Sequence, residues 1–413
     1  MKDTNKLSPK IRFSGFTDDW EQRKLGEVAD IVGGGTPSTS KDEYWDGDID
    51  WYTPAEIIDQ IFVSSSERKI TQEGYDNSSA KMLPIGTVLF TSRAGIGKMA
   101  ILRKKGCTNQ GFQSIVPHAN ELDSYFIFSR SEELKRYGEM VGAGSTFVEV
   151  SGKQMSNMNL LLPKDIREQQ KIGEYFSNLD RLITLHQRKL NGLKNVKKAM
   201  LEKMFPKNGE KIPEIRFSGF TDDWEQRKLS DIYRDIGNAF VGTATPYYVE
   251  EGHFYLESNN VKDGQINHNT EVFINDEFYE KQKDKWLHTG DMVMVQSGHV
   301  GHAAVIPEEL DCSAAHALIM FRNPKVKIEP YFLNYQYQTV KAKKKIENIT
   351  TGNTIKHILA SEMQEFIVDV ASYDEQEKIA GFFSHLDRLI TLHQRKLDKL
   401  KTVKKAMLEK MFI

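Results

Sequence analysis

Two segments of this chain occur twice. Residues 11–25, which read IRFSGFTDDWEQRKL, return unchanged as residues 215–229. Residues 168–205 match residues 375–412 at 30 of 38 positions. The stretches between these repeats have diverged strongly, so the chain combines a doubled surface with two different ones. We interpret this pattern as that of a protein that binds one kind of partner twice and two different targets once each.

The longer repeat has the heptad spacing of a coiled coil, with seam positions alternately four and three residues apart. In the first copy the seam consists of Ile172, Phe176, Leu179, Ile183, His186, Leu190, Leu193, Lys197, Met200 and Met204. Pro163 precedes this helix and Pro206 follows it, where a helix cannot easily continue. The repeat therefore predicts two helices, each roughly 55 Å long at 1.5 Å per residue. We expect them to pack on each other.

Both seams contain polar residues at matching positions, His186 and Lys197 in the first and His393 and Lys404 in the second. Such residues either extend outward from a tolerant seam or fix the register of the helix pair. We favour the first interpretation. Neither residue type is accompanied by an acid or nucleophile, so the seams do not indicate catalysis.

The sequence between the repeats predicts two related domains in which short β-rich runs alternate with glycine turns. Residues 83–102 align with 287–306, and residues 141–162 align with 349–370. The expected fold class is α+β: two homologous mixed α/β domains separated by a pair of long antiparallel coiled-coil helices, in a pseudo-two-fold, cyclic arrangement. The expected segments are an N-terminal arm (1–16), a first domain (17–160), a helical spacer (161–206), a linker (207–220), a second domain (221–367) and a second spacer (368–413).

Composition narrows the class of protein. The formal net charge is −2, so any nucleic-acid surface must be local. The two cysteines, Cys107 and Cys312, indicate neither a disulfide framework nor a metal motif. The N-terminal segment lacks the apolar core of a signal peptide, and no apolar run approaches the ~20 residues needed to span a bilayer. We expect a cytoplasmic protein with no membrane association.

Charge and alignment together predict where nucleic acid binds. Residues 77–120 contain no acidic side chain but several basic ones, and residues 350–361 are acid-free after the cluster Lys341, Lys343, Lys344 and Lys345. In these windows the aligned strands stay apolar while loop side chains change, as expected for a constant scaffold with variable contacts. The predicted DNA-binding residues are Arg93, Lys98, Ser145, Thr146, Lys153, Ser297, His299, His302, Asn353, Thr354, Lys356 and His357.

Catalytic motifs are missing from the sequence. The glycine run at residues 33–35 lacks the Gly-Lys-[Ser/Thr] ending of a phosphate loop, and we favour a plain turn. Asp59 with Glu67-Arg68-Lys69 imitates a nuclease metal site, but so short a pattern arises by chance. A zinc site around His288, His299, His302 and His316 would find no cysteine or carboxylate at ligand spacing except Cys312, so we favour loop histidines that touch DNA or solvent. We therefore expect a binding protein without catalytic, cofactor or metal residues.

A family resemblance rests on three groups of residues. They are the domain opening at residues 33–57 (GGGTPSTSKDEYWDGDIDWYTPAEI), the Gly-x-Thr segments at 144–155 (GSTFVEVSGKQM) and 352–363 (GNTIKHILASEM), and the segments that lead into the long helices at 162–172 and 373–379. With the doubled helix, they make essentially the whole chain resemble the specificity subunit of type I restriction–modification enzymes. The second domain lacks the opening motif of the first.

The resemblance implies two target recognition domains, each reading one half of an asymmetric bipartite site in double-stranded DNA. The helix pair would set the distance between half-sites, and two modification subunits would bind the doubled surface. Those partners would carry S-adenosylmethionine and methylate a flipped adenine, and restriction subunits would supply ATP- and Mg-dependent translocation and cleavage. The alternatives are a stand-alone sequence-specific DNA-binding regulator with coiled-coil-spaced domains and a coiled-coil scaffold without DNA function.

Overall fold

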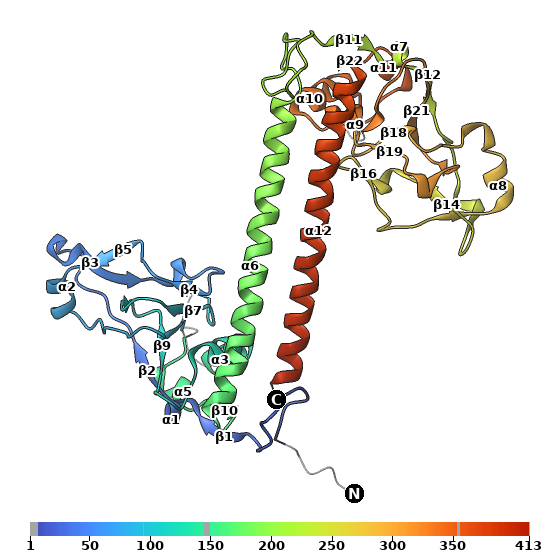
Figure 1. Cartoon of the computed structure of the whole chain (residues 1–413). Helices are drawn as coiled ribbons and strands as arrows, with labels where there is room; N and C mark the ends of the chain where they lie inside the picture. Colours follow the sequence, from blue (N-terminus) through green and yellow to red (C-terminus); the bar gives the residue numbers. More distant parts are fainter. Residues whose placement is uncertain (1–6, 94, 144–148, 353–355, 413) are drawn as a thin grey trace, which may run out of the picture. The chain divides into compact units, whose positions relative to one another are not determined.

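The computed structural model describes residues 7–93, 95–143, 149–352 and 356–412. The chain divides into two compact units, one formed by Met1–Gln187 with Arg395–Ile413 and the other by Arg188–Gln394. The predicted long helices are α6 (Ile166–Lys203) and α12 (Tyr373–Met411), and each contributes one part to each unit (Figure 1). No helix in the described ranges is both long and apolar enough to cross a membrane.

The first unit is built on a five-stranded sheet with the order β2-β9-β6-β7-β4. All neighbours are antiparallel except β4 and β7. The strands are β2 (Ala29–Gly33), β9 (Gln113–Pro117), β6 (Val88–Phe90), β7 (Met99–Leu102) and β4 (Phe62–Val63). A three-stranded sheet adds β5 (Arg68–Ile70), β3 (Trp45–Tyr52) and β8 (Cys107–Thr108). The α-helices of this domain are α1 (Leu25–Val28), α2 (Gln72–Asp76), α3 (Ser124–Ser129), α4 (Ser131–Gly142) and α5 (Gly152–Ser156).

The second unit repeats the centre of this plan. Its four-stranded antiparallel sheet has the order β12-β21-β18-β19. The strands are β12 (Tyr233–Asn238), β21 (Leu318–Pro324), β18 (Met292–Val295) and β19 (Ala303–Val305). The α-helices are α7 (Leu229–Ile232), α8 (Asp276–Glu280), α9 (Pro330–Tyr337), α10 (Val340–Ile349) and α11 (Ala360–Gln364). A separate sheet consists of β13 (Tyr248–Val249), β17 (Phe273–Ile274), β14 (His253–Leu256) and β20 (Ala314–Ala315), and β15 (Val261–Lys262) pairs with β16 (Gln265–Ile266). The mixed α/β class predicted for both domains is confirmed.

The short repeat ties each domain to the start of a long helix. In the first unit Arg12 donates two hydrogen bonds, 2.6 and 2.7 Å long, to the buried carboxylate of Glu168 in α6. In the second unit Arg216 does the same to Glu375 in α12, at 2.7 and 2.8 Å. The repeat then continues as β1 (Glu21–Lys24) or β11 (Glu225–Lys228), each antiparallel to the strand before the helix, β10 (Asn159–Leu162) or β22 (Ile367–Val370).

The same repeat also binds the far end of the other long helix. The backbone N–H of Ile215 donates to the carbonyl of Lys203, the last residue of α6, at 2.8 Å. In the first unit Ile11 makes the equivalent bond to Lys410 near the end of α12, at 2.9 Å. The buried Trp20 packs edge-on against Phe412, as Trp224 does against Phe205. The first arm therefore docks on the end of the second helix, which is the local contact that a cyclic arrangement requires.

We expected the seam lysines to extend outward, but they do not. Lys404 Nζ lies 2.6 Å from the carboxylate of Asp180 in the first unit, and Lys197 Nζ lies 2.6 Å from that of Asp387 in the second. Each aspartate also accepts a 2.9 Å hydrogen bond from a tyrosine of its domain, Tyr125 or Tyr335. His393 is buried as well. The interpretation of tolerated, outward-pointing lysines is wrong, because both lysine side chains are at least partly buried and pair with an aspartate of the facing helix.

Candidate nucleic-acid interface

In the first unit, two loops that carry predicted contact residues are joined through their backbones. The loop between β6 and β7 closes on itself, because the Thr91 hydroxyl donates to the carbonyl of Gly95 (2.7 Å) and accepts from the N–H of Lys98 (2.9 Å). Beside it, Val150 N–H donates to the carbonyl of Ser92 (3.0 Å), and Arg93 forms an antiparallel bridge with Glu149. The segment before α5 is thus held against the β6–β7 loop.

The second unit makes the same connections with different residues. Ile358 N–H donates to the carbonyl of Gln296 (3.0 Å), and Ser297 forms the antiparallel bridge with His357. The β18–β19 loop closes through Gly301 N–H to the carbonyl of Val295 (3.1 Å), as Gly97 N–H closes the first loop on Thr91 (3.0 Å). Both closing glycines have positive φ, 84° and 90°, a conformation that glycine adopts without strain.

We call each pair of joined loops a paired-loop platform: residues 92, 93 and 95–98 with 149–150 in the first unit, and residues 296–302 with 356–358 in the second. The matched bonds place Arg93 at the position of Ser297, Lys98 at that of His302 and Glu149 at that of His357. These are the pairings that the sequence alignment predicted. One backbone framework therefore presents two different sets of side chains.

Most predicted contact residues that the structure describes lie on these platforms. Arg93, Lys98, His299, Lys356 and His357 are exposed, whereas Ser297 and His302 are partly buried. Lys153 is exposed in the first turn of α5, next to the first platform. Ser145, Thr146, Asn353 and Thr354 lie outside the described residues. The structure brings the described candidates together in each unit, and their contact with DNA stays a prediction.

A pocket of about 350 Å³ opens beside the second platform and is lined by His299, His302, Lys343, Glu347 and Lys356, among others. Lys343 is not among the residues that we predicted to contact DNA, although it belongs to the lysine cluster at residues 341–345. Lys341 of that cluster serves a different purpose: its ammonium is largely buried and pairs with Asp369 and the carbonyl of Pro206. A phosphate-contact role for Lys341 is therefore not supported.

The two loop histidines differ in their surroundings. His299 donates from Nε2 to the carbonyl of Ser258 at 2.9 Å. His302 accepts at Nδ1 from the backbone N–H of Asp263 at 3.1 Å, which requires Nδ1 to be unprotonated. Burial lowers the pKa of His302, with the carboxylate of Asp263 opposing that shift. His302 is therefore a neutral hydrogen-bonding group at neutral pH.

Acidification should destabilise the second unit through His302. Because its pKa is lower in the folded chain than in the unfolded chain, its stabilising contribution is complete above the unfolded pKa of about 6.5 and is lost as the pH falls through the folded pKa. Unfolding by urea at a series of pH values should show a smaller loss of stability on acidification in His302→Gln than in the wild type. Identical pH profiles would contradict the neutral, buried state of His302.

The glycine run at residues 33–35 and the nuclease-like pattern contribute to packing in the first unit. A side chain on Gly34 would place its Cβ 2.0 Å from the carbonyl oxygen of Asn109, and Gly35 N–H donates to the carbonyl of Thr108 at 2.9 Å. The glycine run is thus a closely packed segment that begins at the end of β2, and the plain turn that we expected there is not observed. In the nuclease-like pattern Arg68 stacks on Trp45 at 3.8 Å, and Lys69 pairs with Asp50 at 3.8 Å.

Comparison with known proteins identifies the family. The model of the type I restriction modification DNA specificity domain matches residues 17–195 and 221–402. A type I restriction enzyme specificity subunit (MjaIX) of Methanocaldococcus jannaschii is 25% identical over 410 residues, which is 95% of this chain and 92% of the relative. The EcoR124I/EcoR124II specificity subunit of Escherichia coli is 32% identical over 170 residues, which cover 39% of this chain and 41% of that subunit.

A solved structure has the same fold. The S subunit of a type I restriction–modification system from M. genitalium superposes with a TM-score of 0.59, covering 98% of this chain and 99% of that one at 13% identity. The two domain matches span most of the chain, so it belongs to the type I restriction–modification DNA specificity family. It is a specificity subunit, a DNA-recognition component rather than a catalytic one.

Proposed function

We propose that this specificity subunit reads an asymmetric, bipartite DNA site, with each paired-loop platform contacting one half-site. The observation that carries the proposal is the equivalence of the two platforms in backbone bonding and their difference in side chains. Arginine and lysine on the first platform suit guanine edges and phosphates, whereas serine and neutral histidine on the second suit hydrogen bonding to other base edges. Two unlike surfaces on one framework should select two unlike half-sites.

We also propose that the chain acts in the cytoplasm with DNA and with other restriction–modification subunits: two modification subunits and the restriction subunits. The nearly identical helix repeats support a doubled docking surface, because both copies expose the same side chains. These are Arg181, Leu185, Arg188 and Lys189 in α6, and Arg388, Leu392, Arg395 and Lys396 in α12. S-adenosylmethionine, ATP and Mg²⁺ would be carried by the partners, which would methylate adenine or cleave DNA.

The test is co-expression with a competent modification subunit, followed by mapping of methylated adenines in genomic DNA. The expected result is one asymmetric motif with two specified halves and an unspecified spacer. Scattered methylation, or none, would contradict the proposal. Tight sequence-specific binding by the isolated chain, together with a lack of partner-dependent methylation, would instead favour a stand-alone DNA-binding regulator.

Replacing Arg93 by alanine should relax the first half-site and leave the second unchanged. A good arginine–guanine contact contributes about 1–3 kcal/mol of discrimination, roughly 5- to 150-fold between the right and wrong base. Methylome mapping of Arg93→Ala should therefore show degeneracy in one half only. The matched variant His357→Ala, on the other platform, should affect only the other half. Degeneracy of both halves in either variant would contradict the assignment of one half-site to each unit.

A further inference from the structure

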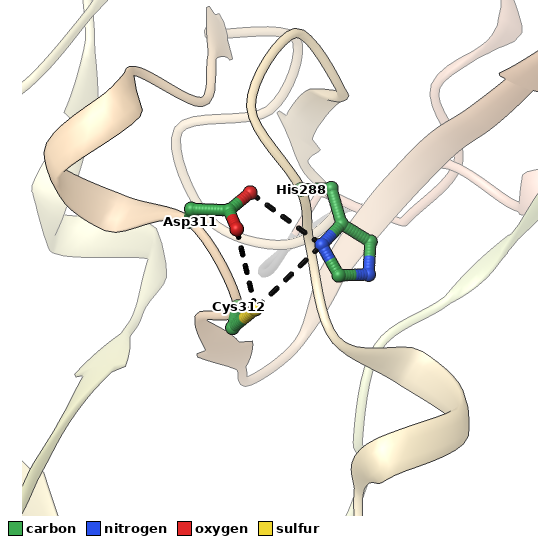
Figure 2. A group of neighbouring side chains, drawn as sticks. All are labelled: His288, Asp311 and Cys312. Carbon is green, nitrogen blue, oxygen red and sulfur yellow. Dashed lines mark hydrogen bonds and ion pairs between the residues drawn. The ribbon is translucent and has the colours of Figure 1, made fainter.

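Three chemically different metal ligands meet on the second unit, away from the paired-loop platform residues. Figure 2 shows the side chains of His288, Asp311 and Cys312 converging. His288 Nδ1 lies 3.4 Å from Asp311 Oδ1 and 3.7 Å from Cys312 Sγ, and Cys312 Sγ lies 3.3 Å from Asp311 Oδ2. This trio is the one group of such side chains, among those the structure describes, whose ligand atoms come close enough to share a metal ion.

The separations are comparable with the edges of a zinc coordination tetrahedron. Zinc binds histidine nitrogen and carboxylate oxygen at about 2.0–2.2 Å and cysteine sulfur at about 2.3 Å. At tetrahedral angles, these bond lengths place neighbouring ligand atoms about 3.3–3.7 Å apart. The nitrogen and the sulfur are 3.7 Å apart, each lies 3.3–3.4 Å from a different oxygen of Asp311, and one ligand atom from each residue lies within 4.8 Å of the others. A zinc ion would bind all three ligands after a rotation of the Asp311 carboxylate.

The backbone holds the trio in place. Leu287 and Ser313, the neighbours of His288 and Cys312, exchange two backbone hydrogen bonds of 2.9 and 3.1 Å. Asp311 Oδ1 accepts from both the N–H (2.8 Å) and the hydroxyl (3.2 Å) of Thr289, the kind of outer contact that orients metal-binding carboxylates. Cys312 has a φ of 62°, which is uncommon for a residue with a side chain and often marks functional positions.

A metal ion would replace the hydrogen bond between Cys312 and Asp311 with a sulfur–metal bond, and the thiol proton would be released to solvent.

We propose that His288, Asp311 and Cys312 form a zinc site with three protein ligands and a fourth position open to water. From the sequence we expected no metal, because no cysteine or carboxylate except Cys312 stood at ligand spacing from the histidines, among which we counted His299 and His302. Those two histidines instead bond to Ser258 and Asp263. The site joins the segment that leads into β18 to the segment that leads into β20, so zinc would fasten two parts of the second unit. This proposal does not depend on the choice of DNA target.

The full-length chain, purified without metal, tests the proposal by titration with Zn²⁺ and with Co²⁺ as a spectroscopic substitute. We expect one equivalent to bind, with a sulfur-to-cobalt charge-transfer band. Cys312→Ser should abolish the band, and His288→Asn should weaken binding by more than the ~10- to 100-fold typical of losing an outer-shell partner. Matched controls are His268→Asn, an exposed histidine of the same unit, and Cys107→Ala, which removes the other thiol. Both controls should bind like the wild type.

A second measurement needs no variant. One equivalent of Zn²⁺ should protect Cys312 of the wild-type chain from alkylation by iodoacetamide, and a chelator should restore the reaction. Failure of the wild type to bind a stoichiometric metal ion would overturn the proposal. Equal binding by Cys312→Ser and His268→Asn, or alkylation of Cys312 at the same rate with and without Zn²⁺, would also overturn it.

Discussion

Replacing Glu375 by alanine should destabilise the second unit by about 3–5 kcal/mol, the usual cost of removing one partner of a buried ion pair. The Glu375 carboxylate is fully buried and accepts two hydrogen bonds from Arg216 and one, 3.2 Å long, from Trp224 Nε1. Its loss leaves a largely buried guanidinium without a counter-ion. Because Arg216 and Trp224 belong to the short repeat, the same change should detach that repeat from α12.

Hydrogen exchange measures this effect in each unit separately. In Glu375→Ala, amide exchange should accelerate in β11 and β22 and stay unchanged in β1 and β10, and Glu168→Ala should give the reverse. Glu168→Ala should lower stability slightly less than Glu375→Ala does, because the indole N–H of Trp20 makes no hydrogen bond to Glu168. Glu365→Ala, which removes an exposed partner of Lys228, is the control and should change little. Equal effects of Glu375→Ala and Glu365→Ala would contradict a structural role for the repeat.

Replacing Asp387 by alanine should lower the free energy of unfolding by about 3 kcal/mol, because it leaves both Lys197 and Tyr335 without their acceptor. The side chain of Lys197 is only 14% exposed. Burial and the neighbouring carboxylate raise the pKa of Tyr335, so its hydroxyl stays a donor at neutral pH. The loss should be seen in the urea-unfolding curve. Asp180→Ala, which removes the acceptor of Lys404 and Tyr125, is the matched change in the first unit.

A double variant separates the attraction of the pair from the cost of an isolated buried charge. Lys197→Met with Asp387→Leu should recover part of the lost stability, because apolar residues often replace a buried ion pair at little cost, whereas the hydroxyl of Tyr335 still lacks its acceptor. If Asp387→Ala were as stable as the wild type, the pair of Lys197 and Asp387 would not contribute to the stability of the second unit.

The repeats made much of the fold predictable. Heptad spacing between Pro163 and Pro206 gave α6 close to its observed bounds, and the second copy gave α12. The alignment of Arg93 with Ser297 predicted the matched platforms, because loops of equal length that are closed by a glycine at the same point place equivalent residues alike. Local periodicity and turn chemistry were sufficient in both cases.

Contacts between distant residues were not predictable in this way. Asp180 reads as an ordinary polar position of a heptad, and nothing local shows that Lys404, 224 residues later, and Tyr125 converge on it. Glu168 likewise reads as an acidic residue in the first turn of a helix, although it is buried against Arg12. His288 and Cys312 are 24 residues apart and meet only because Leu287 pairs with Ser313. All three contacts arise only when distant parts of the chain come together in the tertiary structure.

Recognition of one half-site by each unit is tested most directly by exchanging one domain. In the exchanged chain, a second copy of residues 17–159 replaces residues 221–367; the first nine residues of both stretches are identical, and β1 and β11 pair with their partners in the same register. Methylome mapping with a competent modification subunit should then show a symmetric motif that contains the first half-site twice. Methylation at the original asymmetric motif would contradict recognition of the second half-site by the second unit.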